Sequence, residues 1–373
     1  MLQAVWLDAG ASAPGRLLLC IHHWAVDGVS WRILVPDLAA AWAALAGGAA
    51  PALAPRSTSV RRWAHWLVEE AREARRIGEL SFWRGMLNAP SVSLVEGSLD
   101  CARDVLGTAG RLTLRLPAAL TGPLLTRIPG AFHCSINDVL LTGLVLAIAD
   151  WSRRGGGRSR AVLVDLEGHG REAPSAEVDL SRTVGWLTSV CPVRLDIGAI
   201  DLDEALAGRA ALGRALKLIK EQLRALVDNG LGYGLLRYLN PETAAQLSGA
   251  AVAQIGFNYL GRFAAPAGAD WGLAAEAATF GGGDPAMPLP HALEVNALAL
   301  DGADGATLIA IWSFAPALVA EEAVRDLAES WFAALTTLVH HSEQAGAGGR
   351  SPSDLPLLTL TQDEIERLER AYQ

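Results

Sequence analysis

The chain has 373 residues, of which 51% are hydrophobic, and its formal net charge is −9 at pH 7. The length predicts two lobes or two domains around a sizeable core, and the acidic balance excludes a general attraction to nucleic acid or to an anionic membrane. The N-terminus has no signal-peptide pattern, and the longest apolar stretch, residues 139–149, is too short to span a bilayer. Four scattered cysteines favour a reducing compartment. We therefore predict a cytoplasmic protein with no nucleic-acid or membrane partner.

The N-terminal part predicts two strands followed by helices. Residues 2–8 and 16–22 read as strands around a turn, and the second is a nearly continuous apolar run. Helices are expected over residues 30–45, 59–80 and 81–87. Residues 89–110 have an irregular pattern, and the boundary between the lobes is predicted there. Residues 1–88 then belong to the N-terminal lobe and residues 89–350 to the C-terminal lobe.

The C-terminal part mixes strands and helices without a regular order. The predicted strands cover residues 111–116, 253–261, 292–300 and 307–314; residues 161–172 read as a strand that runs into a Gly-rich loop, and residues 183–196 as another extended segment. The predicted helices cover residues 135–151, 201–227 and 318–342. Ser135 is the expected N-cap of the first of these helices. This irregular alternation predicts a mixed α/β architecture. Residues 351–373, which contain proline and acidic residues, predict a linker-like tail.

The most informative segment is HHWAVDGVSW, which runs from His22 to Trp31. Two adjacent histidines at the end of a strand point to opposite faces, so that one can face a cleft while the other packs inside. Gly28 permits a sharp turn, and the positive N-terminal end of the next helix suits chemistry that develops negative charge on an oxygen. His23 is therefore the candidate acid or base and His22 a structural residue. A pair of purely structural histidines is the alternative.

Four further segments follow this one along the chain. They are residues 165–172 (DLEGHGRE), 181–188 (SRTVGWLT), 230–234 (GLGYG) and 256–261 (GFNYLG). Together the five segments resemble, in the correct order, motifs of the epimerization domains of nonribosomal peptide synthetases, with Leu187 in place of a Phe. The first segment is similar to the HHxxxDG signature of the whole condensation-domain superfamily. The resemblance implies a two-lobed α/β fold like that of chloramphenicol acetyltransferase, with mixed sheets and flanking helices.

The position of the HHxxxDG segment departs from the family pattern. In that superfamily the signature lies well inside the chain, whereas here it begins at residue 22. The resemblance therefore implies a chain that lacks the opening elements of the N-terminal lobe. We expect exposed apolar strand edges and a substrate channel that lacks one wall.

Epimerization needs two acid/base groups, because the α-proton leaves one face of the carbon and a proton returns to the other. By resemblance, His23 is one of these groups and Glu167 the other, and Glu167 then needs an environment that raises its pKa. An ordinary exposed loop carboxylate is the alternative for Glu167. Asn258 and Tyr259 are candidates for orienting the substrate or stabilising the enolate, and Tyr233 is a weaker one. Packing at a strand end is the alternative for all three.

Asp27 is predicted to have a structural role. In the superfamily the aspartate of the signature pairs with an arginine, and Arg171 is the expected partner here. The alternative is that Asp27 itself acts as a base. His169 is expected to shape its loop, with assistance to the reaction as the alternative. Trp31 and Trp186 are candidates for lining the channel.

The resemblance implies epimerization of an L-aminoacyl or peptidyl thioester on a peptidyl carrier domain during nonribosomal synthesis of an antibiotic or other secondary metabolite. The implied partners are an upstream carrier domain and a downstream condensation domain. The only implied cofactor is the phosphopantetheine arm of the carrier domain; the chain itself is expected to bind no cofactor and no metal. The alternatives are a condensation domain that forms amide bonds, a non-catalytic docking module or fragment, and an acyltransferase acting on coenzyme A thioesters.

Overall fold

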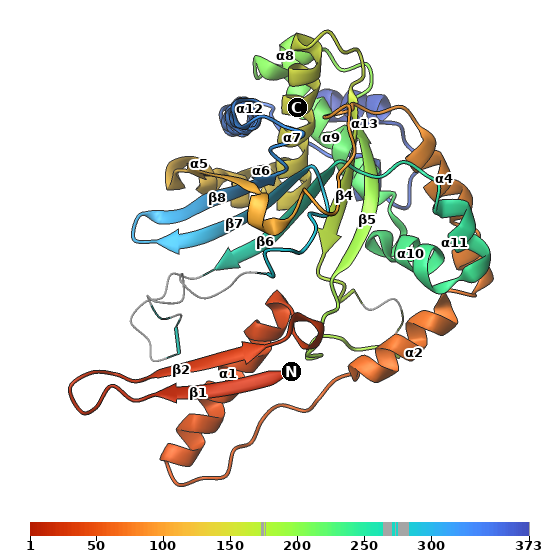
Figure 1. Ribbon diagram of the computed structural model, residues 1–373. Helices are drawn as coiled ribbons and strands as arrows, with labels where there is room; N and C mark the ends of the chain where they lie inside the picture. The colour runs from red at the N-terminus through yellow and green to blue at the C-terminus, as the bar shows by residue number, and fades with distance from the viewer. Residues whose placement is uncertain (173–174, 176, 264–270, 273, 275–282, 373) are drawn as a thin grey trace.

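The N-terminal elements of the chain form a small layer of their own (Figure 1). The structure, a computed structural model, describes residues 1–172, 175, 177–263, 271–272, 274 and 283–372. The first elements are β1 (Leu2–Leu7), β2 (Arg16–Ile21), the 3-10 turn η1 (His23–Ala25) and α1 (Gly28–Ala46). Strands β1 and β2 pair with each other in antiparallel register and with no other strand of the described part.

The larger sheet carries the candidate site. Its six described strands lie in the order β3-β8-β7-β6-β4-β5. They are β3 (Gly110–Leu116), β4 (Ala161–Gly168), β5 (Ser189–Asp196), β6 (Ile255–Phe263), β7 (Leu293–Gly302) and β8 (Gly305–Phe314). The central strands β4, β6 and β7 are parallel, and the outer pairs are antiparallel. The predicted mixed α/β fold is thereby confirmed.

Helices pack on one face of this sheet and around its edges (Figure 1). The longer ones are α2 (Val60–Glu70), α4 (Leu80–Asn88), α5 (Ala118–Leu125), α7 (Ile136–Arg154), α9 (Ala210–Arg224), α12 (Glu321–His341) and α13 (Gln362–Tyr372). The shorter ones are α3 (Ala74–Ile77), η2 (Leu106–Thr108), α6 (Arg127–Phe132), α8 (Leu202–Leu206), η3 (Val227–Gly230), α10 (Leu231–Gly234), the π-helix η4 (Leu235–Leu239), α11 (Pro241–Leu247) and η6 (Pro352–Asp354).

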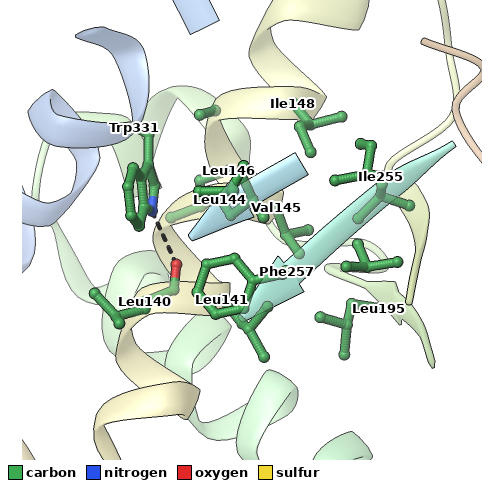
Figure 2. Close-up of a cluster of buried hydrophobic side chains, with 14 of the residues drawn as sticks. Leu140, Leu141, Leu144, Val145, Leu146, Ile148, Leu195, Ile255, Phe257 and Trp331 are labelled. Atoms are coloured by element: carbon green, nitrogen blue, oxygen red, sulfur yellow. Dashed lines mark hydrogen bonds between the residues drawn. The ribbon is translucent and has the colours of Figure 1, made fainter. Parts of the chain in front are cut away.

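Helix α7 is the centre of the core. Ser135 begins it as predicted: the Ser135 Oγ accepts a hydrogen bond from the Asp138 N–H at 3.2 Å, and the Asp138 carboxylate accepts one from the Ser135 N–H at 2.6 Å. Every residue from 138 to 149 is buried, because α12, α9 and the sheet surround the helix. Figure 2 shows the α7 side chains packed against Phe257, with the Trp331 indole of α12 donating to the Leu140 carbonyl at 3.0 Å.

Two predicted helices are interrupted. The segment 59–80 forms α2 and α3 and ends where α4 begins, because the Arg76 guanidinium is buried and binds Glu70, Glu79 and Asp228. The segment 201–227 is divided into α8 and α9 at Gly208, whose φ of +74° ends the first helix. Tertiary contacts override the helical pattern in the first case, and a left-handed residue does so in the second.

The predicted extended segment 183–196 is a strand only from Ser189 onward. The preceding residues do not pair with a neighbouring strand. Instead, the Gly185 N–H and carbonyl both bond to the Ser30 hydroxyl of α1, and the Leu187 N–H donates to Asp27, which caps α1. The Thr183 carbonyl accepts a hydrogen bond from Arg171. This part of the motif therefore joins the N-terminal elements to the large sheet.

Residues of the predicted tail contact α9. The Lys220 ammonium is buried and donates to Asp354 at 2.6 Å and to the Phe132 carbonyl at 3.2 Å. Ile365 of α13 is buried as well, whereas Leu357, in the connection between η6 and α13, is 95% exposed. The tail is thus attached to the lobe at two places, and residue 373 lies outside the described residues.

Helix α1 is long and apolar enough, by length and composition, to cross a membrane, although only a small part of it is buried. The segment formed by α5, α6 and α7 meets the same criteria as a pair, but it bends by 101°, and α7 fills the core. The N-terminal end of α1 makes specific polar contacts with the loop after β4, described below, as an element of a folded domain does.

Candidate active site

Polar side chains gather on one face of the three parallel strands. Asp165 of β4 is in register with Gly256 of β6, which is in register with Glu294 of β7. Two residues further along the strands, Glu167 and Asn258 lie on this same face, because side chains alternate along a strand. The opposite face is apolar and packs on α7. The strand register therefore brings these polar side chains together on one face of the sheet.

This face lines a small pocket that contains Glu167. The lining residues are Asp165, Glu167, Val190, Gly256, Phe257, Asn258, His291 and Glu294. The Glu167 side chain is half-buried, and burial, followed by the nearby Glu294 carboxylate, raises the pKa of Glu167. His23, a hydrogen bond with Asn258, and His291 act in the opposite direction but do not cancel the rise. The environment thus provides the raised pKa that the proposed chemistry requires of Glu167.

His23 belongs to the short turn η1, between β2 and α1, and lies within electrostatic range of Glu167. Its exposed ring meets the edge of Trp186, with 4.7 Å between the ring centroids. His22 is exposed too, and its Nδ1 accepts a hydrogen bond from the Trp24 N–H at 3.2 Å. The expectation that one histidine packs inside is wrong, because β2 ends at Ile21 and strand alternation does not extend to the pair.

Asp27 caps α1 and binds Arg171 across the junction. The two side chains are 3% and 6% exposed, and both carboxylate oxygens accept from the guanidinium, at 2.7 and 2.8 Å. Asp27 also accepts from the N–H and hydroxyl of Ser30, both at 2.8 Å, and from the Leu187 N–H at 3.2 Å. Burial acts to raise the pKa of Asp27, but these hydrogen bonds hold it below its usual value. An ionised, fully bonded Asp27 fits a structural role.

The loop after β4 is shaped so that Arg171 reaches Asp27. Gly170 has a φ of +62°, and a Cβ there would lie 1.7 Å from the Leu187 carbonyl oxygen, so only glycine fits. The His169 Nδ1 accepts from the Arg171 N–H at 3.1 Å, and its Nε2 lies 3.5 Å from Glu172. His169 therefore contacts its own loop. At Gly28, by contrast, φ is not positive and a Cβ would meet nothing within 4 Å, so the structure gives no conformational need for glycine there.

The structure separates the two neighbouring candidates on β6. Asn258 bonds to Glu167 and lines the pocket. Tyr259 points to the other face of the strand and packs against the main core. Tyr233 also packs there, with its ring 5.4 Å from that of Trp83. Asn258 is thus brought to Glu167, whereas neither tyrosine lines the pocket.

Two titratable residues that line the pocket lie outside the five quoted segments and were not singled out from the sequence. They are His291, which precedes β7, and Glu294 within it. A usable indication was present: Glu294 and Asn296 interrupt an otherwise apolar strand at alternate positions, which places both on one face. The pairing of His291 with Asp165 had no such indication, because the two are far apart in the chain.

Comparison with known proteins places the chain in a family. A family model described as "Condensation domain" matches residues 10–347. The chain is 36% identical over 370 residues to a linear gramicidin synthase from Brevibacillus parabrevis, covering 98% of this chain and 7% of that protein. It is 32% identical to tyrocidine synthase 1 of the same organism, covering 94% of this chain and 31% of that protein. The chain thus spans only a small part of these curated relatives.

Solved structures give the same family. The epimerization domain from the third module of tyrocidine synthetase B superposes with a TM-score of 0.74 at 30% identity, covering 88% of this chain and 69% of that one. The first condensation domain of the CDA synthetase superposes with a TM-score of 0.56 at 19% identity, covering 93% and 68%, a likeness of fold alone. With a family model that matches most of its length and the predicted fold in place, the chain belongs to the condensation-domain family.

Proposed function

We propose that this chain is an epimerization domain that inverts the α-carbon of an L-aminoacyl or peptidyl thioester carried by a peptidyl carrier domain. The observation that carries the proposal is Glu167, a half-buried carboxyl with a raised pKa within electrostatic range of His23. The sequence motifs, and the 30% identity to an epimerization domain over most of the chain, support the same function. The substrate arrives on the phosphopantetheine arm of the carrier domain. The partners are the carrier domain and a neighbouring condensation domain, in the cytoplasm.

Epimerization requires two groups, each of which can gain and lose a proton. One takes the α-proton, and the electrons of the broken C–H bond move into the thioester, which becomes an enolate. The other donates a proton to the opposite face of the carbon, and the thioester carbonyl re-forms. A carboxyl with a raised pKa and an imidazole can both do this near neutral pH. Asn258, bonded to Glu167, holds that carboxyl in position.

The test is α-proton exchange. A carrier domain loaded with an L-aminoacyl thioester is mixed with the protein in heavy water, and mass spectrometry follows deuterium at the α-carbon. Glu167→Gln should lower the exchange rate at least about 100-fold, as loss of a general acid/base does. Glu172→Gln is the matched control, because it changes a glutamate of the same loop that does not line the pocket. We expect wild-type exchange from this control.

The rival activity of amide-bond formation gives a different outcome. A condensation domain would join two carrier-bound substrates without exchanging the α-proton, and its rate would not depend on the Glu167 carboxylate. Amide product without deuterium incorporation, equal in wild type and Glu167→Gln, would therefore replace epimerization by condensation. Absence of both products from a folded protein would leave the non-catalytic docking module.

A further inference from the structure

His291 lies on the polar face of the sheet, where neighbouring residues fix the position of its ring. Its Nε2 lies 2.9 Å from the Asp165 Oδ2, and its Nδ1 is buried without a hydrogen-bond partner among the described residues. A Cβ at Gly256 would lie 2.5 Å from this Nδ1 and 2.8 Å from the Cε1 of the same ring. The imidazole thus lies directly over β6 where the strand has no side chain. The first glycine of the GFNYLG segment provides that space.

Glu294 is held on the same face by a separate contact. Asn296, two residues along β7, donates from its Nδ2 to the Glu294 Oε1 at 2.8 Å. Because Glu294 is in register with Gly256, its side chain lies beside the position taken by the His291 ring. Next to Glu167, the pocket therefore contains the His291 imidazole, oriented by the Asp165 carboxylate, and the Glu294 carboxylate, oriented by Asn296.

The charged groups around Glu167 come from several elements. Asp165 belongs to β4, His23 to η1, Glu294 to β7, and His291 to the segment before β7, whereas the other strands that line the pocket contribute Val190, Phe257 and Asn258, which carry no charge. The Glu294 carboxylate raises the pKa of Glu167, and the two histidines lower it. Glu294 and His291 thus act in opposite directions on one carboxyl.

We propose that His291, oriented by Asp165, and Glu294 are positioning residues that together set the pH range in which Glu167 gains and loses its proton. This role rests on the proposed function of Glu167 in epimerization. The His291 ring carries a positive charge whenever both of its nitrogens are protonated. The His291 cation then favours the Glu167 carboxylate, and the Glu294 anion favours its protonated form. A group that must serve as both base and acid works best when neither its charged nor its protonated form is strongly favoured, and the opposite charges of His291 and Glu294 provide that balance.

The decisive experiment uses two neutralising variants with opposite expected signs. In His291→Gln, the acidic limb of the pH profile of α-deuterium exchange should move to higher pH by at least about half a unit, because a cation is lost. In Glu294→Gln the same limb should move to lower pH, because an anion is lost. Damage to the pocket alone would lower the rate in both variants without shifts of opposite sign. His340→Gln, which changes an exposed histidine of α12, is the matched control with an unmoved limb.

A second measurement does not depend on turnover. With the glutamate carboxyl carbons labelled with ¹³C, the resonance that disappears in Glu167→Gln is that of Glu167, and its titration midpoint can be followed in each variant. Midpoints that move up in His291→Gln and down in Glu294→Gln support the proposal even if the wild-type protein exchanges no α-proton. The absence of α-proton exchange in the wild-type protein would refute only the proposed function. Midpoints that stay fixed, or that move in the same direction, overturn the role of His291 and Glu294.

Discussion

Replacing Asp27 by Asn should loosen the start of α1 from the loop after β4. The substitution keeps the size of the side chain and its ability to cap the helix, but it removes the charge that faces Arg171. Since the Arg171 side chain is only 6% exposed, its guanidinium would stay buried without a counter-ion. Breaking one partner of such a buried pair costs about 3–5 kcal/mol. The free energy of unfolding should fall by an amount in this range.

A double-mutant cycle isolates the pair itself. Arg171→Met leaves the buried Asp27 charge with hydrogen bonds from Ser30 and Leu187 but without a counter-ion, so its cost should be similar to that of Asp27→Asn. In the double variant no charge remains unpaired, and its cost should be less than the sum of the two single costs by about 2 kcal/mol or more. Denaturant unfolding followed by fluorescence, with hydrogen exchange of the α1 amides, measures each variant. Additive costs would refute the argument that these two side chains stabilise each other.

The pH dependence of this effect has a definite sign. The pKa of Asp27 is lowered in the folded protein, so the carboxylate contributes its full stabilisation above the ordinary aspartate pKa of about 3.9. The contribution is lost as the pH falls through the lower folded value. The difference in unfolding free energy between wild type and Asp27→Asn should therefore be constant from about pH 7 to pH 5 and should narrow in more acidic solution. A difference that vanishes already at about pH 6 would contradict this assignment.

Three further substitutions test other contacts. Gly232→Ala should destabilise the fold by about 2 kcal/mol or more in thermal unfolding, because its Cβ would lie 1.9 Å from the Glu79 Oε2; an unchanged Tm would show that this carboxylate moves aside freely. Gly170→Ala should slow α-deuterium exchange and lower the Tm, since both its positive φ and the Leu187 carbonyl exclude a side chain; wild-type values for both would refute this. Lys220→Met should speed proteolytic cleavage near the exposed Leu357, because Asp354 loses its ion-pair partner. An unchanged cleavage rate would show that the remaining contacts, such as those of Ser353 with Glu221, hold the tail without this ion pair.

Helices and strands of this fold were predictable where neighbouring residues in the sequence determine them. Ser135 followed by a long apolar run predicts the start and burial of α7, and alternating or continuous apolar residues predict the strands. The order of the strands was not predictable, because β6 lies between β4 and β7 through parallel pairings that join distant segments. The break between α2 and α3 could not be predicted from Arg76, because its three carboxylate partners come from two separate regions of the chain.

In the candidate site, too, residues within recognisable segments could be predicted, and residues joined only by the fold could not. Glu167 and Asn258 could be named because each lies within a recognisable segment, and the parallel pairing of β4 with β6 then brings the two segments together. His291 could not be named, because its partner Asp165 is 126 residues away and only the folded sheet joins them. The alternation of Glu294 and Asn296 in β7 indicated a polar face but not what that face contains.

The glycines of the motifs carry information about these distant neighbours. A Cβ at Gly256 would collide with the His291 ring, one at Gly170 with the Leu187 carbonyl, and one at Gly230 with the Cys191 sulfur. In each case the glycine marks where a second segment comes too close for a side chain, and the sequence names the glycine without naming that segment. At these three positions the glycine is evidence for a contact whose partner only the structure supplies, whereas a Cβ at Gly28 or Gly234 would meet nothing within 4 Å. At Gly256 that partner is the His291 imidazole, which lines the same pocket as Glu167, so this glycine shapes the pocket as well as the path of the strand.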